Sequence, residues 1–223
     1  EPWAYRNKMQ MPVGGTKGDI QMGFYAMGSH DIVQGTNCPI QDEGNNIIAQ
    51  ACYQIAKEFD IKPYDEHTGK GVLRHIIGRI GQSGWMIILV TATEQLPYKE
   101  KWVEKLTQRI PQVETIVHNV NGKRTNVILG PKNNILYGDG TITDHIKDLQ
   151  FTLSPHSFFQ VNPEQTTVLY DQALTYADLK GDETVIDAYC GTGTISLFLA
   201  HKAKHVIGIE IVEPAIINAR ENA

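Results

Sequence analysis

Two acidic residues and the glycine-rich turn between them form the part of the sequence best suited to chemistry. An apolar run ends at Asp187, and the turn Cys190-Gly-Thr-Gly193 follows. A second apolar run ends at Glu210, 19 residues after Gly191. Glycines allow a tight strand-to-helix turn and a close approach of ligand to backbone, and an acid at this spacing accepts hydrogen bonds from ribose hydroxyls. The pattern predicts a site for an adenosine-containing cofactor.

The form of the turn distinguishes between cofactors. Dinucleotide folds carry G-x-G-x-x-G and seat a pyrophosphate on the helix N-terminus, whereas Ser196 stands at the third glycine position here. Asp187 would repel a pyrophosphate, but it suits S-adenosylmethionine (SAM), which carries a sulfonium and an amino group. We therefore favour SAM. A nicotinamide cofactor and a βαβ turn that binds no ligand are the alternatives.

Composition places the chain among ordinary globular proteins. It has 223 residues, of which 41% are hydrophobic and 20% charged, with a formal net charge of −5. No apolar run approaches the ~18 residues that span a bilayer, and no charged-then-apolar leader opens the chain, so we expect no membrane partner. Three cysteines do not make a disulfide framework, which indicates the reducing cytoplasm. The negative net charge argues mildly against a protein that binds nucleic acid by itself. We also expect a monomer.

Residues 1–153 alternate helical and strand-like patterns. They predict a central α+β domain with a mixed sheet and helices on one face, in an α/β chain. Glycine-containing and Asn-Gly turns between apolar runs predict hairpins, and 3.6-residue periodicity predicts helices. The expected strands are 19–27, 31–33, 73–79, 85–91, 113–119 and 126–129, with a further pair after Gly140, and the expected helices are 45–59, capped by Asn45 or Asp42, and 98–110.

Residues 154–223 predict the N-terminal part of a Rossmann-like domain. Pro163 suits the first turn of a helix over 163–179 that Asn162 can cap, with Val168, Leu169, Leu174 and Ala177 on one side. The remaining pattern is strand 184–188, helix 195–203, strand 205–211 and a helix from Pro214. Such sheets have five or more strands, so we expect this domain to be incomplete and the chain to be part of a longer protein.

Three sequence blocks together carry a resemblance that covers nearly the whole chain. They are Tyr5-Arg-Asn-Lys-Met-Gln-Met-Pro-Val13 with His30-Asp-Ile-Val33 and Cys38-Pro39, then Ser157-Phe-Phe-Gln-Val-Asn-Pro163, then Asp187-Ala-Tyr-Cys-Gly-Thr-Gly193 with Gly208-Ile-Glu210 and Asn218-Ala-Arg-Glu-Asn222. The chain resembles the 5-methyluridine RNA methyltransferases, SAM-dependent enzymes that methylate C5 of uridine. The resemblance is to the type that acts on 23S rRNA.

The resemblance implies a SAM pocket at matching positions. Gln160 and Tyr189 correspond to cofactor-pocket residues, and Glu210 corresponds to the ribose ligand. Thr194 stands where relatives often carry Asn. The expected cofactor-binding residues are Gln160, Asp187, Tyr189, Gly191, Thr194 and Glu210.

The resemblance also implies roles for cysteines. In this family the residue matching Cys38 is commonly the last of four thiolates that hold an iron–sulfur cluster. Its three partners would lie outside this sequence, so we expect a cluster in the parent protein at most. Cys52 lies on the apolar face of a predicted helix and is expected to be core.

No residue of this chain is expected to be catalytic. Uracil C5 is too weak a nucleophile to attack SAM directly, so in this family a thiolate first adds to C6 and a base later removes the C5 proton. The catalytic Cys follows an Asp-Pro-Pro-Arg motif that is absent from the 223 residues. Cys190 lies inside the glycine turn, where we expect it to pack rather than react. We therefore expect no methyl transfer by this chain alone.

The sequence indicates the residues that contact RNA less clearly than those that bind the cofactor. Arg6 and Lys8 alternate on an expected strand beside Tyr5, which can stack on a base; Arg74, His75 and Arg79 are further basic candidates. Ordinary solvated charge is the alternative interpretation. The expected partner is an rRNA loop with a flipped uridine. Two other functions stay open: SAM-dependent methylation of an exocyclic amine of a nucleic acid, and a non-catalytic RNA-binding module.

Overall fold

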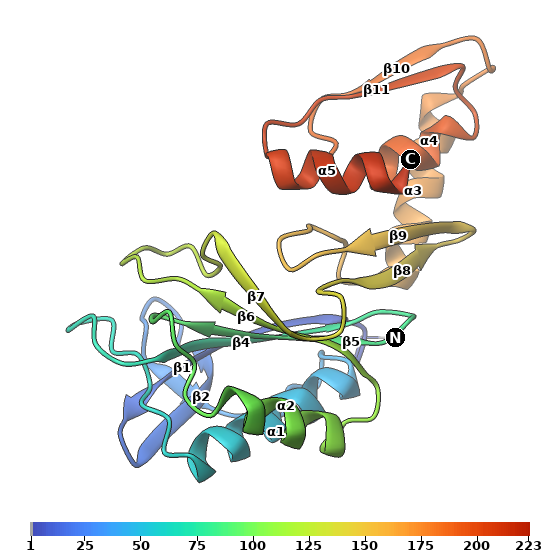
Figure 1. The fold of residues 1–223 in the computed structure, drawn as a ribbon. Coiled ribbons are helices and arrows are strands. Elements are labelled where there is room, and N and C mark those ends of the chain that lie inside the picture. Colours follow the sequence, from blue (N-terminus) through green and yellow to red (C-terminus); the bar gives the residue numbers. More distant parts are fainter. Residues whose placement is uncertain (1) are drawn as a thin grey trace. The chain divides into compact units, whose positions relative to one another are not determined.

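The computed structural model describes residues 2–223, which form two compact units, residues 2–140 and residues 141–223 (Figure 1). The division falls before the last antiparallel strand pair, whereas the sequence suggested a boundary after residue 153. The pair belongs with the second unit because its Phe151 ring packs against Phe159, with ring centroids 5.7 Å apart. The backbone N–H of Thr152 also donates to Oδ1 of Asn222 over 2.8 Å.

A seven-stranded sheet organises the first unit. Its strand order is β3-β2-β1-β4-β5-β6-β7. The strands are β1 Lys8–Thr16, β2 Asp19–Tyr25, β3 Ile32–Gln34, β4 Leu73–Ile80, β5 Trp85–Thr91, β6 Val113–Val120 and β7 Lys132–Tyr137. All neighbours are antiparallel except β5 and β6, which are parallel. The predicted mixed sheet is therefore confirmed, and the parallel pair is connected through a helix, as parallel strands require.

Two helices, α1 Glu43–Glu58 and α2 Lys99–Arg109, cover one face of this sheet (Figure 1). Asp42 begins α1 as predicted, since its Oδ1 accepts the N–H of Gly44 over 2.8 Å. The apolar stripe of α1 is buried together with Trp102 and Leu106 of α2. The 3.6-residue spacing thus identified both helices.

The loop after β6 differs from the predicted tight turn at Asn121-Gly122. The partner of β6 is β7, which begins only at Lys132, so the expected strand 126–129 was wrong. Two asparagine side chains satisfy the backbone of the intervening loop instead. Asn119 bonds both the N–H and the C=O of Gly130, at 2.7 and 2.8 Å, and Asn121 donates to the carbonyl of Val127 at 2.6 Å.

The second unit contains a hairpin and one βαβ unit. Its elements are β8 Ile142–Ile146, β9 Leu149–Leu153, α3 Pro163–Ala177, β10 Thr184–Asp187, α4 Thr194–Ala200, β11 His205–Gly208 and α5 Glu213–Asn222. β10 and β11 are parallel neighbours, joined through α4 as the sequence predicted. No helix among residues 2–223 has the length and apolar character needed to cross a membrane.

Helix α3 begins as predicted but buries a different side. Asn162 caps it by accepting the N–H of Gln165 over 3.1 Å, and Pro163 occupies its first turn. Val168 and Leu169, expected on the packed side, are exposed. The buried side chains of α3 are Thr166 and Tyr170, and the Tyr170 ring meets Phe198 of α4 edge-on at 5.6 Å. The side chain of Tyr170 therefore makes the helix contact that the aliphatic pattern suggested for Val168 and Leu169.

Candidate cofactor site

The glycine turn connects β10 to α4 in a conformation that only glycine adopts easily. Gly191 has φ of 55° and Gly193 has φ of 84°, both left-handed. A Cβ added at Gly191 would meet nothing within 4 Å. The space beside this residue is therefore open, and a ligand can approach its backbone closely.

Glu210 faces the turn from the end of β11. One carboxylate oxygen accepts the N–H of Gly191 at 3.1 Å, and the other accepts those of Ile211 and Val212 at 2.7 and 2.9 Å. These bonds, that from Val212 above all, lower the pKa of Glu210, so the side chain is ionised at neutral pH. The predicted acid is thus present, charged and aligned with the glycine turn.

Asp187 is held by the residue that replaces the third glycine. The hydroxyl of Ser196 donates to Oδ2 of Asp187 over 2.6 Å, while Oδ1 accepts the N–H of Tyr189 at 3.4 Å. A glycine at position 196 could not make the first of these bonds. The departure from the dinucleotide pattern therefore orients the acid at the end of β10, a role of Ser196 that the sequence interpretation did not include.

Thr194 and Tyr189 lie on either side of the turn in different environments. The hydroxyl of Thr194 bonds the Tyr170 hydroxyl over 2.8 Å, which ties the start of α4 to α3. Tyr189 is 91% exposed and is available to a ligand. Their predicted contacts with the cofactor stay predictions.

The segment between β9 and α3 reaches the same turn. The hydroxyl of Thr192 donates to the carbonyl of Phe158 over 3.2 Å. Phe159 is buried against Phe151, Phe158 is 68% exposed, and Gln160 is half-buried. The structure therefore brings the segment that contains Gln160 next to the glycine turn, from which it is separated by some 30 residues of sequence.

Two asparagines of α5 form hydrogen bonds with the segment before α3 and with the glycine turn. Oδ1 of the buried Asn218 accepts the hydroxyls of Ser154 and Ser157 at 3.0 and 2.7 Å. Asn222, one helical turn later, donates to the carbonyl of Thr192 at 3.1 Å. Both residues belong to a sequence block that carries the family resemblance, but the sequence assigned neither a role. Their i, i+4 spacing, which places them on one face of a helix, was the available signal.

Replacing Asn218 by alanine is expected to lower the free energy of unfolding of the second unit by about 1–3 kcal/mol, because two serine hydroxyls lose a buried acceptor. Hydrogen exchange across residues 154–162 should accelerate, measured by mass spectrometry. Asn218→Asp keeps an acceptor oxygen and serves as the control, with exchange close to the wild type. Unchanged exchange in Asn218→Ala would show that the segment is held by other contacts.

Cys190 is poorly suited to act as a nucleophile. Burial, followed by the negative charges of Asp187 and Glu210, raises the pKa of its thiol, and the thiolate is the reactive form. Its sulfur occupies the space beside Gly208, where an added Cβ would lie 2.9 Å from it. These observations support the expected packing role.

The other two cysteines are separate from this turn. Cys52 is fully buried on α1, and burial raises the pKa of its thiol. The backbone of Cys38 is bonded by the Asn46 side chain. Residues 2–223 contain no group of three or more His, Cys, Asp or Glu side chains placed to hold a metal ion, so the residues present do not fit an iron–sulfur cluster. A role for Cys38 in a longer chain stays a prediction.

Basic candidates for RNA contact fall into two groups. Arg74, His75 and Arg79 are buried and are not solvated surface charges. Lys8 lies close to other cations: burial, then the charges of Arg79 and Arg6, lowers its pKa to about 8. The guanidinium Nε of Arg6 donates to the carbonyl of Lys8 at 3.1 Å. This local positive charge is consistent with a contact to phosphate, which stays a prediction for Arg6 and Lys8.

Known proteins similar to this chain are methyltransferases. A family profile described as a methyltransferase domain matches residues 179–223. Proteins named as uncharacterized RNA methyltransferases are 52% identical in Halalkalibacterium halodurans and 50% identical in Bacillus cereus, in each case over 100% of this chain and 49% of the relative. One from Clostridium tetani is 50% identical over 99% of this chain and 49% of its own length. The chain thus spans about half the length of the curated relatives it matches.

A solved structure resembles the whole chain. The tRNA (uracil-54, C5)-methyltransferase of Pyrococcus abyssi, in complex with S-adenosyl-L-homocysteine, matches 100% of this chain and 53% of its own, with a TM-score of 0.82 and 24% identity. At this identity the likeness shows the fold. The expected fold class, an α+β domain followed by the start of a Rossmann-like methyltransferase domain, is confirmed. Along its whole length, this chain is similar to about half of an RNA methyltransferase.

Proposed function

We propose that this chain is part of a SAM-dependent RNA methyltransferase that acts on C5 of uridine. The observation that carries the proposal is the ionised Glu210 bonded to the N–H of Gly191, beside open space. When bound, SAM supplies an electrophilic methyl group. The donor set present, two acids and a glycine turn without a third glycine, suits a cationic adenosine cofactor better than a pyrophosphate.

The side chains divide the task of cofactor binding between them. Glu210 accepts hydrogen bonds from ribose hydroxyls, and Asp187, oriented by Ser196, attracts the positive charge of the cofactor. Gln160 closes the pocket from the segment that Thr192 holds, and the exposed Tyr189 covers its outer side. Thr194, bonded to Tyr170, fixes the start of α4.

The RNA acceptor is supported by the names of the relatives, and the choice of uracil C5 by the sequence resemblance. A thiolate adds to C6, C5 takes the methyl group from the sulfonium and so releases the thioether product, a base removes the C5 proton, and elimination expels the thiolate. We propose that residues outside these 223 supply the thiolate and the base. The proposed acceptor is a flipped uridine in a loop of 23S rRNA. A tRNA is the alternative, because the Pyrococcus enzyme is named for one.

Release of tritium from RNA that contains [5-³H]uridine tests the proposal, because only C5 methylation expels the C5 hydrogen. The full-length protein, with SAM and either rRNA or tRNA, is expected to release tritium in step with methyl incorporation. Methyl incorporation without tritium release would instead indicate an exocyclic amine as acceptor. RNA binding without transfer would indicate a non-catalytic module.

The 223-residue chain tested by itself is expected to transfer no methyl group. Robust turnover by this chain would contradict the requirement for a thiolate from elsewhere in the protein.

A further inference from the structure

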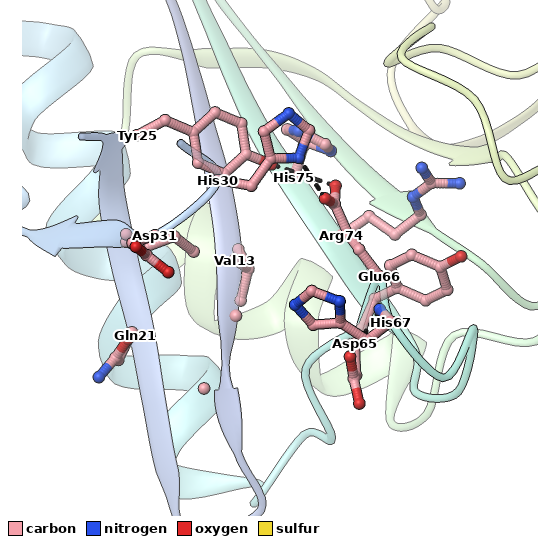
Figure 2. Close-up of a pocket in the computed structure, with 14 residues that line it drawn as sticks. Val13, Gln21, Tyr25, His30, Asp31, Asp65, Glu66, His67, Arg74 and His75 are labelled. Carbon is pink, nitrogen blue, oxygen red and sulfur yellow. Dashed lines mark hydrogen bonds and ion pairs between the residues drawn. The ribbon is translucent and has the colours of Figure 1, made fainter. Parts of the chain in front are cut away.

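The first unit contains a cavity of about 320 Å³ that the cofactor chemistry does not use. It lies among β1, β2 and the start of β4, with the loops around residues 30 and 66 at its rim (Figure 2). All its lining residues belong to Glu1–Gly140, whereas the glycine turn belongs to Thr141–Ala223. It is therefore a site distinct from the one described above.

One aromatic pair and one cation–π pair contribute to the lining. The rings of Tyr25 and His30 stack at 4.8 Å with an interplanar angle of 16°, and the Arg74 guanidinium lies 4.5 Å from the centre of the Tyr64 ring. Glu66 holds the first pair in place, because its carboxylate accepts hydrogen bonds from Nδ1 of His30 at 2.5 Å and from the Tyr25 hydroxyl at 3.3 Å (Figure 2). These planar groups form a preorganised surface for a planar ligand.

One residue of the lining carries a buried nitrogen that has no hydrogen-bond partner among residues 2–223. His75 is only 6% exposed, and its Nδ1 makes no hydrogen bond within residues 2–223. Burial lowers the pKa of His75 to about 4, so the ring is neutral at neutral pH, with one nitrogen that donates and one that accepts. Buried polar groups are normally satisfied, and His75 is one of the residues that line the cavity, so we take its ring as a bonding partner for a ligand.

The charge and the volume of the cavity limit the kinds of ligand that it can bind. Three carboxylates, Asp31, Asp65 and Glu66, line the cavity with the single guanidinium of Arg74, so a phosphate is disfavoured and a group that donates N–H is favoured. The volume is at the lower end of that of small-ligand pockets, which suits a single nucleobase.

A second positive charge, that of Arg124, lies beside the cavity. Arg124 lines a neighbouring hollow of about 180 Å³ together with Tyr64, Glu66 and Arg74. Arg124 also donates to the backbone carbonyls of Glu66 and His67 at 3.0 and 2.6 Å. A base in the acidic cavity would thus have a cation nearby for its phosphate.

We propose that this cavity is a second RNA subsite, which takes one base with an exocyclic amine from an unpaired strand. The inference rests on the proposed function only in that the partner is RNA. The base stacks on the Tyr25–His30 pair and bonds His75 and the carboxylates. Adenine, cytosine and guanine carry the required amine, and uracil does not.

Fluorescence anisotropy of the full-length protein with labelled oligo(A), oligo(C) and oligo(U) tests the subsite. His75→Leu is expected to weaken binding of oligo(A) or oligo(C) about tenfold, the effect of one hydrogen bond to a buried group, and to leave oligo(U) unchanged. The fold should tolerate the change, because it removes a buried atom without a partner and nearly keeps the volume. His75→Asn, which keeps a polar group close to the position of Nδ1, should retain part of the affinity that His75→Leu loses.

Glu66→Gln should also reduce the preference for amine-bearing bases, since it removes a negative charge that attracts the amine. Glu104→Gln is the matched control and should leave all three affinities unchanged. Glu104 is an exposed carboxylate on α2 that pairs with Lys101. Thermal melts of each variant check that the fold is retained.

Equal effects of His75→Leu on all three oligonucleotides, or none, would overturn base recognition by this cavity. Binding of an arginine-rich peptide that depends on His75, without such an effect on RNA, would assign the cavity to a protein partner and also overturn the inference. Tritium release from [5-³H]uridine is measured in parallel. Its presence without base preference would reject the subsite alone, whereas its absence would reject the proposed function.

Discussion

Glu210→Ala is expected to weaken SAM binding by the full-length protein about hundredfold, measured by isothermal titration calorimetry. The substitution removes a charged acceptor for the ribose, and hydrogen bonds to charged groups contribute about 1.5–3 kcal/mol each. It also removes the bond that ties the end of β11 to the N–H of Gly191. The loss of SAM affinity should therefore exceed the loss caused by removing a single peripheral contact.

Glu183→Ala is the matched control. The Glu183 carboxylate also accepts backbone N–H groups, from Lys180 at 2.8 Å and Gly181 at 3.0 Å. Glu183 precedes β10, at the end of the strand opposite the glycine turn, so its loss should leave SAM affinity unchanged. Equal affinities of the Glu210 variant and the wild type would contradict the cofactor site and favour a non-catalytic module.

Trp102→Ala is expected to destabilise the first unit by about 3–5 kcal/mol, the range for truncation of a large buried aromatic. Trp102 of α2 is 0% exposed and packs in the cluster between the helices and the sheet. Urea unfolding, followed by hydrogen exchange in β5 and β6, reports on this unit separately from the second.

Trp102→Phe should cost much less than the alanine substitution. Phenylalanine fills most of the space and removes an indole N–H that has no partner within residues 2–223. Trp3→Ala is a control for loss of an indole, since Trp3 is 59% exposed. A loss below about 1 kcal/mol for Trp102→Ala would mean that the core can collapse around the cavity.

Local sequence signals identified many of the helices, strands and turns. Asp42 and Asn162 cap the helices that they were expected to cap, and the apolar spacing predicted the helix over 45–59 that α1 forms. These signals act over about four residues, the reach of a helical turn or a cap. The glycine turn belongs to the same class, because the left-handed conformation of Gly191 and Gly193 is a local requirement.

Where local signals competed, the sequence interpretation failed. Asn121-Gly122 has the composition of a tight hairpin, but Asn119 and Asn121 bond a longer loop instead. Val168 and Leu169 are apolar, yet α3 packs through Tyr170 because the ring meets Phe198 and the hydroxyl meets Thr194. In each case the deciding partner lies beyond the reach of a helical turn, 6 and 11 residues along the chain for the two asparagines and 24 residues along for the Tyr170 hydroxyl.

By itself, then, the sequence determined the class of fold, the position of the glycine turn and the acids beside it. Only the tertiary structure revealed the bonds that link distant segments: Asn218 to Ser157, 61 residues apart, and His30 to Glu66, 36 residues apart. The cavity of the first unit likewise exists only because β1, β2 and β4 bring its lining residues together. Short-range geometry follows from residue type, whereas long-range contacts depend on how all the strands pair, which no single segment specifies.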